Sequence, residues 1–419
     1  MRRSRSGGSQ APSRLLIIDG LRFLAALSVA VFHLMAVAGR GAGTKVDVWG
    51  QPAKAVFPNL FKFASYGWVG VPLFFIISGF VICMSSWGRT PRQFLAARVS
   101  RLYPAYWACI AITTCVSMAL PAVYKPVPPR ALLANLTMLQ DPLGAPRVDE
   151  VYVTLWAEMR FYALFTVLML FGLTYRRVVW FCLGWSALSV WSLEWHQPWL
   201  GSILMPGGSQ YFIGGIALFL VYKFGSRPVL WFIIGFSWIL SMYFYAGNAW
   251  QGIKHQPYWP ASVLITMVYV VFALISLGWF QNLKWRGLTV LGATSYPLYL
   301  LHYVIGLTVI YYLYQRLTIS PRLFLALLIA ALIGVAWLVH RLIERPLAPR
   351  LKAALAGFDL PARQRRAGGP GPEVKPEASD PATRIHEAQD AHVQPPEHEE
   401  SRPVVPPQRG WLEVGDSLV

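Results

Sequence analysis

The segment LLIIDGLRFLAALSVAVFHLMAVA, from Leu15 to Ala38, is the first long apolar stretch of the chain. It is long enough for a helix that crosses the hydrocarbon core of a bilayer, which takes about 20 residues. It also contains Arg22 and His33. At about 100° and 1.5 Å per residue, both side chains share one helix face, about 16 Å apart along the axis. Ionisable groups inside a membrane helix are costly and usually face a polar cavity, so the segment predicts a membrane protein with a site inside its helices.

The composition of the whole chain supports this prediction. Of its 419 residues, 55% are hydrophobic and 13% are charged, and the mean hydropathy is +0.45. These values are typical of membrane proteins rather than of soluble domains. We therefore expect an all-α polytopic membrane protein with about ten transmembrane helices. The expected spans are approximately residues 15–38, 67–88, 104–123, 151–173, 178–195, 208–224, 228–246, 260–281, 288–314 and 322–347.

The distribution of charge predicts the orientation and the domains. Short basic loops alternate with longer, less basic ones, so the positive-inside rule predicts that the N- and C-termini are both cytoplasmic. We expect a basic cytoplasmic N-terminus (1–14), a transmembrane domain (15–350) and a disordered cytoplasmic tail (357–419) that is rich in Pro, Glu, Ser and His. The outward loops 39–66 and 124–150 would form a partial lid or a surface that binds the acceptor.

The net charge and the cysteines exclude some classes of function. The formal net charge is +18. Basic cytoplasmic loops and an anionic substrate account for this charge. Nucleic-acid binding is not indicated, because we expect no soluble basic domain. The four cysteines lie in apolar runs without zinc-binding spacing, so we expect no metal site. The chain also lacks a G-x-S-x-G elbow, an H-E-x-x-H motif and a Walker loop.

Three ionisable residues are candidates for the chemistry. With this topology, His33, Glu158 and His302 lie in the outer half of the helix bundle. Glu158 is the only acid in the middle of an expected span. A carboxylate can orient an imidazole that accepts a hydroxyl proton, so we expect Glu158 to orient His33. In the alternative, Glu158 neutralises Arg160 and His33 hydrogen-bonds the backbone of a helix.

Two arginines are candidates for binding an anionic group. Arg98 and Arg101 precede the third span and lie three residues apart on one helix face, where they could bind phosphates. Glu344 lies near the same boundary at the end of the tenth span. Retention of basic residues in cytoplasmic loops is the alternative explanation for the two arginines.

Five segments form an ordered series of motifs: Asp19–Arg22 with His33, Gly70–Phe80, Arg98–Pro104, Thr154–Tyr162 and Ser295–His302. In this order they resemble the signatures of the membrane acyltransferase-3 family, which includes polysaccharide O-acetylases and macrolide O-acyltransferases. The first is an R-x10-H pattern, and the third and fourth are similar to R-x-x-R-l-y-P and W-[ST]-L-x-x-E-x-x-F-Y. One departure is Tyr152, which stands where the family usually has Trp. The chain also lacks the fused esterase-like domain of some relatives.

The resemblance implies an O-acyltransferase of the cytoplasmic membrane that acts on the cell envelope or on secreted compounds. An acyl group, usually acetyl, would pass from cytoplasmic acyl-CoA (acetyl-CoA) to a hydroxyl of a carbohydrate, glycolipid or macrolide acceptor. Acyl-CoA would be a substrate, with no bound cofactor. His33 would be catalytic, supported by Arg22 and Glu158, and Arg98 and Arg101 would bind the donor. We expect a supporting set of Asp19, Ser78, Tyr296, Tyr299, His302 and Glu344.

Two other classes of function fit the same residues. A transporter or flippase for a glycan or lipid would use the buried charges as a translocation path, without turnover of acyl-CoA. A membrane scaffold that signals through its tail would lose its function when residues 357–419 are deleted. Within the enzyme hypothesis, direct transfer and an acyl-histidine intermediate both remain open.

Overall fold

The structure is a computed structural model that describes residues 15–38, 46–194, 198–247, 257, 259–280, 283, 285 and 287–357. These residues form helices and connecting loops, with no β-strand among them. The expected all-α class is confirmed. Internal contacts separate residues 1–360 from residues 361–419. The predicted N-terminus (1–14) lies outside the described residues, as does the predicted tail except for Gly357.

The elements have the following bounds in chain order. The first half contains α1 (Leu16–Val31), η1 (Phe32–Val37), α2 (Ala53–Val56), α3 (Leu60–Ala64), η2 (Gly67–Val69), α4 (Gly70–Ser86), α5 (Pro91–Ala119), α6 (Pro129–Leu136), η3 (Glu150–Tyr152), α7 (Val153–Leu170) and α8 (Tyr175–Glu194). The second half contains α9 (Pro198–Leu204), α10 (Ser209–Phe224), α11 (Pro228–Gly247), α12 (Trp259–Ser276), α13 (Gly287–Leu313), η4 (Tyr314–Arg316), α14 (Pro321–Val339), η5 (His340–Glu344) and α15 (Arg345–Gly357).

Eight helical segments of the described chain are long and apolar enough to cross a membrane. The other two expected spans coincide with α8, which carries Arg176, Arg177 and Glu194 near its ends, and with the shorter apolar helix Pro228–Phe244 of α11. The chain is therefore a multi-pass membrane protein. The eight segments are Leu16–Val37, Leu60–Ser86, Pro91–Ala119, Glu150–Leu170, Trp199–Phe224, Trp259–Ser276, Gly287–Arg316 and Pro321–Leu355.

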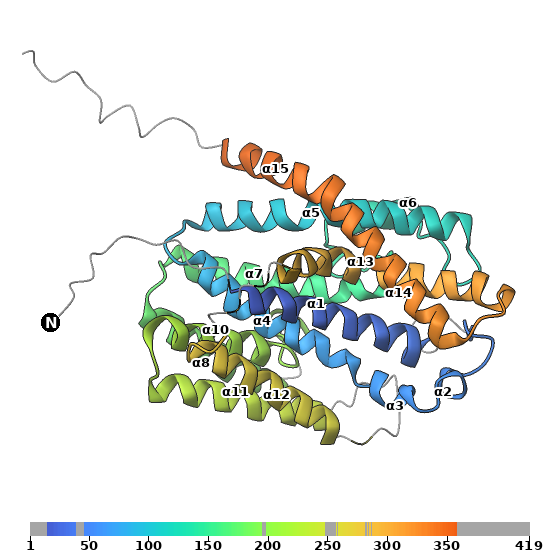
Figure 1. Cartoon of the computed structure of the whole chain (residues 1–419). Coiled ribbons are helices and arrows are strands. Elements are labelled where there is room, and N and C mark those ends of the chain that lie inside the picture. Colours follow the sequence, from blue (N-terminus) through green and yellow to red (C-terminus); the bar gives the residue numbers. More distant parts are fainter. Residues whose placement is uncertain are drawn as a thin grey trace, which may run out of the picture. The chain divides into compact units, whose positions relative to one another are not determined.

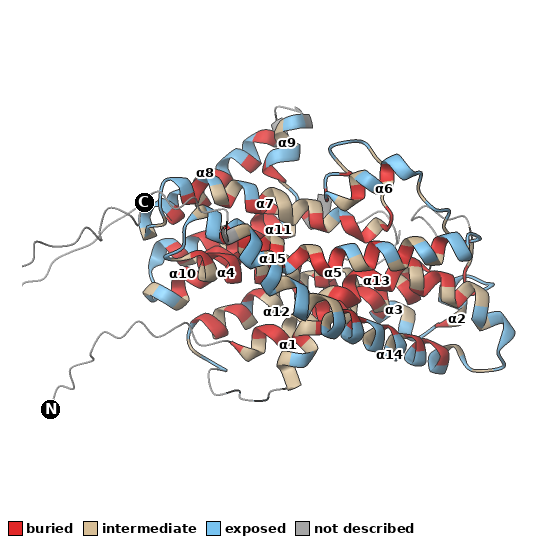
Figure 2. Ribbon diagram, turned by 90° about the horizontal axis from the view of Figure 1, so that it is seen from above, coloured by how far each residue is buried: buried red, intermediate tan, exposed pale blue. Residues whose placement is uncertain are grey.

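Small residues set the distances between the helices that form the site. A Cβ atom on Gly79 of α4 would lie 2.2 Å from the carbonyl oxygen of Phe212 in α10. A Cβ atom on Gly292 of α13 would lie 2.5 Å from the Cβ atom of Asp19 in α1. Close approach at small residues is the usual way in which membrane helices pack. Figure 1 shows α1, α4 and α13 among the other long helices, and in Figure 2 buried residues follow α4, α10 and α13.

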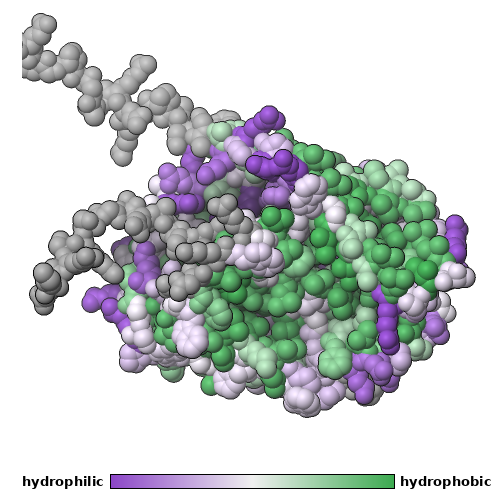
Figure 3. All heavy atoms as spheres, viewed as in Figure 1, coloured by the Kyte–Doolittle hydropathy of each residue, from purple (hydrophilic) through white to green (hydrophobic). Residues whose placement is uncertain are grey.

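The surface agrees with a membrane environment. Figure 3 shows broad hydrophobic surface over the middle of one face, with hydrophilic residues gathered towards its two ends. Large apolar side chains are exposed on many helices, among them Trp180, Phe232 and Met267. In water such a surface would be unfavourable, whereas lipid chains cover it without cost.

Two of the long helices contain a π-helical turn: η1 lies at the end of α1, and η5 lies between α14 and α15. η1 follows α1, and the N–H of Ala38 donates to the carbonyl oxygen of His33 at 2.8 Å. η5 follows α14 and contains both His340 and Glu344. π-turns are rare and occur frequently at functional sites. The sequence predicts continuous helices here, so these turns are a difference between the expected and the observed structure.

The outward loops predicted at 39–66 and 124–150 contain short helices. Residues 46–66 include α2 and α3, and residues 124–150 include α6. The side chain of Asn135 in α6 accepts from the backbone N–H of Val148 at 3.0 Å and donates to the carbonyl oxygen of Pro146 at 2.9 Å. Asn135 thus fixes the return of the second loop towards α7. A lid role for either loop stays a prediction.

Candidate active site

Two histidines from different helices meet in the structure. The Nδ1 atom of His33, on η1, lies 2.8 Å from the Nε2 atom of His302 in α13. The two rings are stacked with centroids 5.1 Å apart, and the Tyr303 ring packs edge-on against His33 at 4.8 Å. His302 is fully buried, whereas His33 is half-buried. The structure therefore brings together two predicted site residues that lie 269 positions apart in the chain.

The hydrogen-bond network assigns the tautomers of this pair. The Nδ1 atom of His302 lies 2.8 Å from the carbonyl oxygen of Tyr299. Because a carbonyl oxygen only accepts, this Nδ1 carries a proton, and Nε2 of neutral His302 is an acceptor. His33 therefore donates its Nδ1–H to His302, and its own Nε2 carries the lone pair. In the part of the chain that the structure describes, this Nε2 has no hydrogen-bond partner. It is therefore available as a base.

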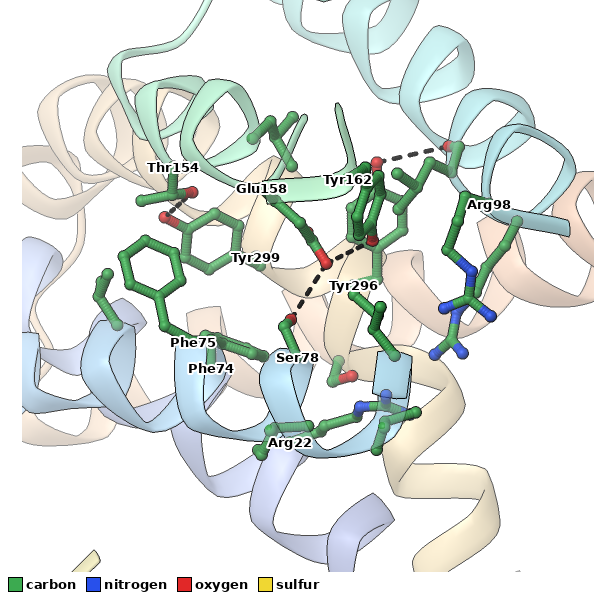
Figure 4. Close-up of a pocket in the computed structure, with 18 residues that line it drawn as sticks. Arg22, Phe74, Phe75, Ser78, Arg98, Thr154, Glu158, Tyr162, Tyr296 and Tyr299 are labelled. Atoms are coloured by element: carbon green, nitrogen blue, oxygen red, sulfur yellow. Dashed lines mark hydrogen bonds between the residues drawn. The ribbon is translucent and has the colours of Figure 1, made fainter. Parts of the chain in front are cut away.

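A cavity of about 90 Å³, which we call the arginine cavity, lies between α1, α4, α5, α7 and α13. Figure 4 shows its lining, with the aromatic rings of Phe74, Phe75 and Tyr299 on one side, Arg22 and Arg98 on the other, and Glu158 between them. The cavity brings together seven of the predicted site residues, namely Arg22, Ser78, Arg98, Arg101, Glu158, Tyr296 and Tyr299.

Glu158 lies in this cavity and not beside His33. Its Oε1 atom accepts from the hydroxyl of Ser78 at 3.1 Å and from the hydroxyl of Tyr162 at 2.5 Å (Figure 4). The predicted pairing of Glu158 with His33 is therefore wrong, because equal depth along two helices does not fix the direction of their side chains. The alternative pairing with Arg160 is not formed either, since Arg160 donates to the carbonyl oxygen of Ser202.

The arginines of the cavity are incompletely paired. Arg98 is buried and its Nη2 donates to the Ser85 hydroxyl at 3.5 Å, but its Nε has no partner among the described residues. Arg22 is 3.7 Å from the Asp19 carboxylate, and no described acid pairs with the exposed Arg101. Three guanidinium groups thus line a cavity that contains a single carboxylate, Glu158. Such a surface favours an anionic ligand.

A second cavity of about 410 Å³, the Glu344 cavity, shares Arg22 and Arg101 with the first. Its lining includes Asp19 and Glu344, the two predicted residues that remain. His340 also lines it, and its Nδ1 lies 2.9 Å from Oε2 of Glu344. His340 is not among the predicted site residues, although its position four residues before Glu344 places both side chains on one helix face and indicates the contact.

Tyr299 connects the arginine cavity to the histidines. Its ring lines the cavity and packs edge-on against Phe74, with centroids 5.5 Å apart, while its carbonyl oxygen accepts from His302. Its hydroxyl lies 2.8 Å from Oγ1 of Thr154 and 3.2 Å from the carbonyl oxygen of Val151. One residue therefore belongs to both the arginine cavity and the histidine pair.

The fold and this site define a class: a multi-pass membrane protein in which Tyr299 joins a histidine pair to a cavity lined by three arginines. Comparison with known families shows which family within that class the chain belongs to. The model of the acyltransferase-3 family, described as an acyltransferase domain, matches residues 15–341. The chain belongs to this family and is a membrane acyltransferase, so the resemblance predicted from the sequence is confirmed.

Two curated relatives are similar to the chain. The exopolysaccharide production protein ExoZ of Rhizobium meliloti (strain 1021) is 28% identical over 327 residues, which cover 70% of this chain and 94% of that protein. Protein 2 in the picA locus of Rhizobium radiobacter is 30% identical over 138 residues, covering 31% of this chain and 58% of that protein. No solved structure matches the chain.

Proposed function

We propose that the protein is an O-acyltransferase of the cytoplasmic membrane, with both termini in the cytoplasm. It moves an acyl group, such as acetyl, from cytoplasmic acyl-CoA to a hydroxyl of a carbohydrate at the outer side. The observation that carries the proposal is a histidine pair in which Nε2 of His33 has no partner among the described residues, and which Tyr299 joins to a cavity lined by three arginines.

The arginine cavity suits the donor because coenzyme A carries several phosphate groups. Charge-assisted hydrogen bonds between guanidinium and phosphate contribute about 1.5–3 kcal/mol each. Arg98 and Arg101 bind these phosphates in the proposal. Arg22 is about 16 Å below His33 along the helix, a distance comparable to the pantetheine arm. The thioester then reaches the histidine pair past Tyr299.

In the direct route, Nε2 of His33 accepts the proton of the acceptor hydroxyl as the oxygen attacks the thioester carbonyl carbon. A C–O bond forms and the C–S bond breaks. The thiolate leaves and takes the proton back from His33, so the products are an ester and free CoA. Neutral His302 stabilises the transient imidazolium because it accepts from Nδ1–H of His33.

A second route also fits the geometry. Nε2 of His33 attacks the thioester carbonyl carbon itself, and CoA leaves as the thiolate. The acceptor hydroxyl then attacks the acyl-imidazole, so that a C–O bond forms, the C–N bond to His33 breaks, and the hydroxyl proton passes to the thiolate. A burst of CoA release in the absence of an acceptor supports this route, whereas CoA release that strictly requires the acceptor supports direct transfer.

The proposed acceptor class rests on the comparisons. The relative that the chain covers almost completely is named for exopolysaccharide production. We therefore propose an exopolysaccharide, or the glycolipid from which it is built, as the acceptor in preference to a macrolide.

The test uses the full chain in lipid nanodiscs with acyl-CoA and exopolysaccharide oligosaccharides, with ester formation followed by mass spectrometry. Removing a general base typically lowers the rate by about 10²–10⁴-fold. We therefore expect His33→Ala to lower the rate of ester formation by a factor in this range. His386→Ala, which lies outside the residues matched by the family model, is the control and should keep full activity. Transport of a glycan without acyl-CoA turnover would overturn the proposal in favour of a flippase.

A further inference from the structure

Asp149 is a buried acid that the mechanism above does not use. It immediately precedes η3 and is 1% exposed. Its Oδ1 accepts from the backbone N–H of Val151 at 3.1 Å, and its Oδ2 accepts from the backbone N–H of Val304 at 3.1 Å. The second contact joins the start of the α7 span to α13, two residues beyond His302.

Two neighbours of Asp149 hold α13 on the other side of His302. The carbonyl oxygen of Val151 accepts from the Tyr299 hydroxyl at 3.2 Å, and Oγ1 of Thr154 lies 2.8 Å from the same hydroxyl. We call Asp149, Val151 and Thr154 the α13 clamp. Its contacts lie three residues before and two residues after His302, so His302 sits between two fixed points.

This part of α13 needs such support. Pro297 lies inside the helix, and a proline removes a backbone hydrogen bond and tends to kink the helix. The carbonyl oxygen that holds His302 belongs to Tyr299, two residues beyond this proline. A displacement of about 1 Å at a reacting group can cost about 100-fold in rate, so a bend here would misplace the histidine pair.

Asp149 forms no ion pair with any of the described residues. The nearby Arg147 pairs with Asp141 and with Glu150 instead. A buried carboxyl that no cation compensates is costly, and burial raises the pKa of Asp149 to about 7 despite two backbone N–H donors. Its position is therefore better explained by the two helices that it joins than by stability alone.

We propose that Asp149 is a positioning residue that holds α13, and through it the His33–His302 pair, in the geometry that catalysis needs. The inference rests on the proposed function, because its kinetic effect is measured on acyl transfer. Asp149 itself does not touch the reacting atoms in the proposal; it acts through the backbone of Val304 and through His302.

The test compares Asp149→Asn with Asp141→Asn in the full chain in nanodiscs. Asn keeps an oxygen for the local bond to Val151 N–H but cannot also accept from Val304. We expect kcat to fall about 10- to 100-fold, with KM for acyl-CoA unchanged within about twofold, since the arginine cavity is intact. Asp141→Asn removes the same charge from the same loop and keeps an acceptor for Arg147, so we expect wild-type kinetics.

A second measurement does not depend on turnover. The rate at which diethyl pyrocarbonate modifies His33, followed by mass spectrometry, should change in Asp149→Asn and not in Asp141→Asn. Tyr299→Phe removes the other clamp bond without changing a charge and should alter the same rate. If wild type transfers no acyl group but His33 reactivity changes as expected, the proposed function fails and the clamp stands. If Asp149→Asn keeps wild-type kcat and His33 reactivity, the clamp is overturned.

Discussion

The two parts of the site differ in how completely their polar groups are paired. In the histidine pair, His302 uses both ring nitrogens and His33 uses one, which leaves one nitrogen free within the described chain. In the arginine cavity, Arg98 keeps a buried Nε without a partner, and Arg101 forms no ion pair with an acid of the described residues. The pair is already organised for a proton transfer, whereas the cavity leaves cationic groups for a ligand to pair.

This contrast predicts that substitutions in the pair change kcat and that substitutions in the cavity change KM. After His33 itself, the largest effect within this comparison is expected at His302. His302→Ala removes the acceptor for Nδ1–H of His33, so the tautomer and ring orientation are no longer fixed, and kcat should fall about 100-fold. His302→Gln offers an oxygen near the position of Nε2, so its kcat should be about tenfold higher than that of His302→Ala, or more.

The measurement is steady-state CoA release with saturating acceptor, for wild type and both variants. Thermal unfolding of each variant controls for loss of fold. Equal activity of His302→Ala and His302→Gln would show that the hydrogen bond to His33 has no role and would remove one side of the comparison.

The next largest effect is expected in the cavity. Arg98→Ala should raise KM for acyl-CoA about 10- to 100-fold, the value of one charge-assisted contact, with kcat within about threefold of wild type. The difference should shrink for acyl-pantetheine, which lacks the nucleotide phosphates. Arg92→Ala, on the same helix but outside the cavity lining, is the matched control and should keep the wild-type KM. A fall in kcat at unchanged KM would contradict a donor-binding role.

Most of the fold follows from residue types and spacing alone. Apolar runs of about 20 residues predict helices that span a membrane, and the structure has helices at all ten expected positions. The cavity residues could be predicted as a group because they lie in five motifs that resemble one family. Arg98 and Arg101 also needed only the three-residue spacing of a helix face.

The partner of His33 could not be predicted in this way. Helical rise fixes the depth of a residue, but the order in which helices pack around each other decides which side chains meet. His33 contacts His302 because α1 packs along α13, and the close approach at Gly292 that allows this is visible only in the structure. The π-turn at Phe32–Val37 likewise has no signal in the local sequence.

Glu158 now belongs to the cavity side of the comparison. Glu158→Gln keeps an oxygen that accepts from Ser78 and Tyr162, so we expect activity within about tenfold of wild type. The pH dependence of kcat/KM should keep the wild-type limb that reports the base, since His33 is paired with His302 instead. A shift of this limb would return Glu158 to the role of an orienting carboxylate.

The smallest expected effect is a change in thermal stability with pH at Asp149, whose carboxyl joins α13 to the start of the α7 span near the histidine pair. Burial raises its pKa to about 7, well above the ordinary value of about 3.9 for an aspartate. The folded state therefore favours the protonated form, and ionisation of Asp149 destabilises the fold as the pH rises from about 4 through 7.

Wild type should melt a few degrees higher at pH 5 than at pH 8 on this account, and Asp149→Asn should lose this part of the pH dependence. Thermal unfolding in nanodiscs across this range, with Asp141→Asn as control, measures the difference. If the melting temperature depends on pH identically in wild type and Asp149→Asn, the raised pKa is contradicted. The carboxyl would then be ionised throughout this range, and it would need a compensating charge or water in addition to the backbone N–H groups of Val151 and Val304.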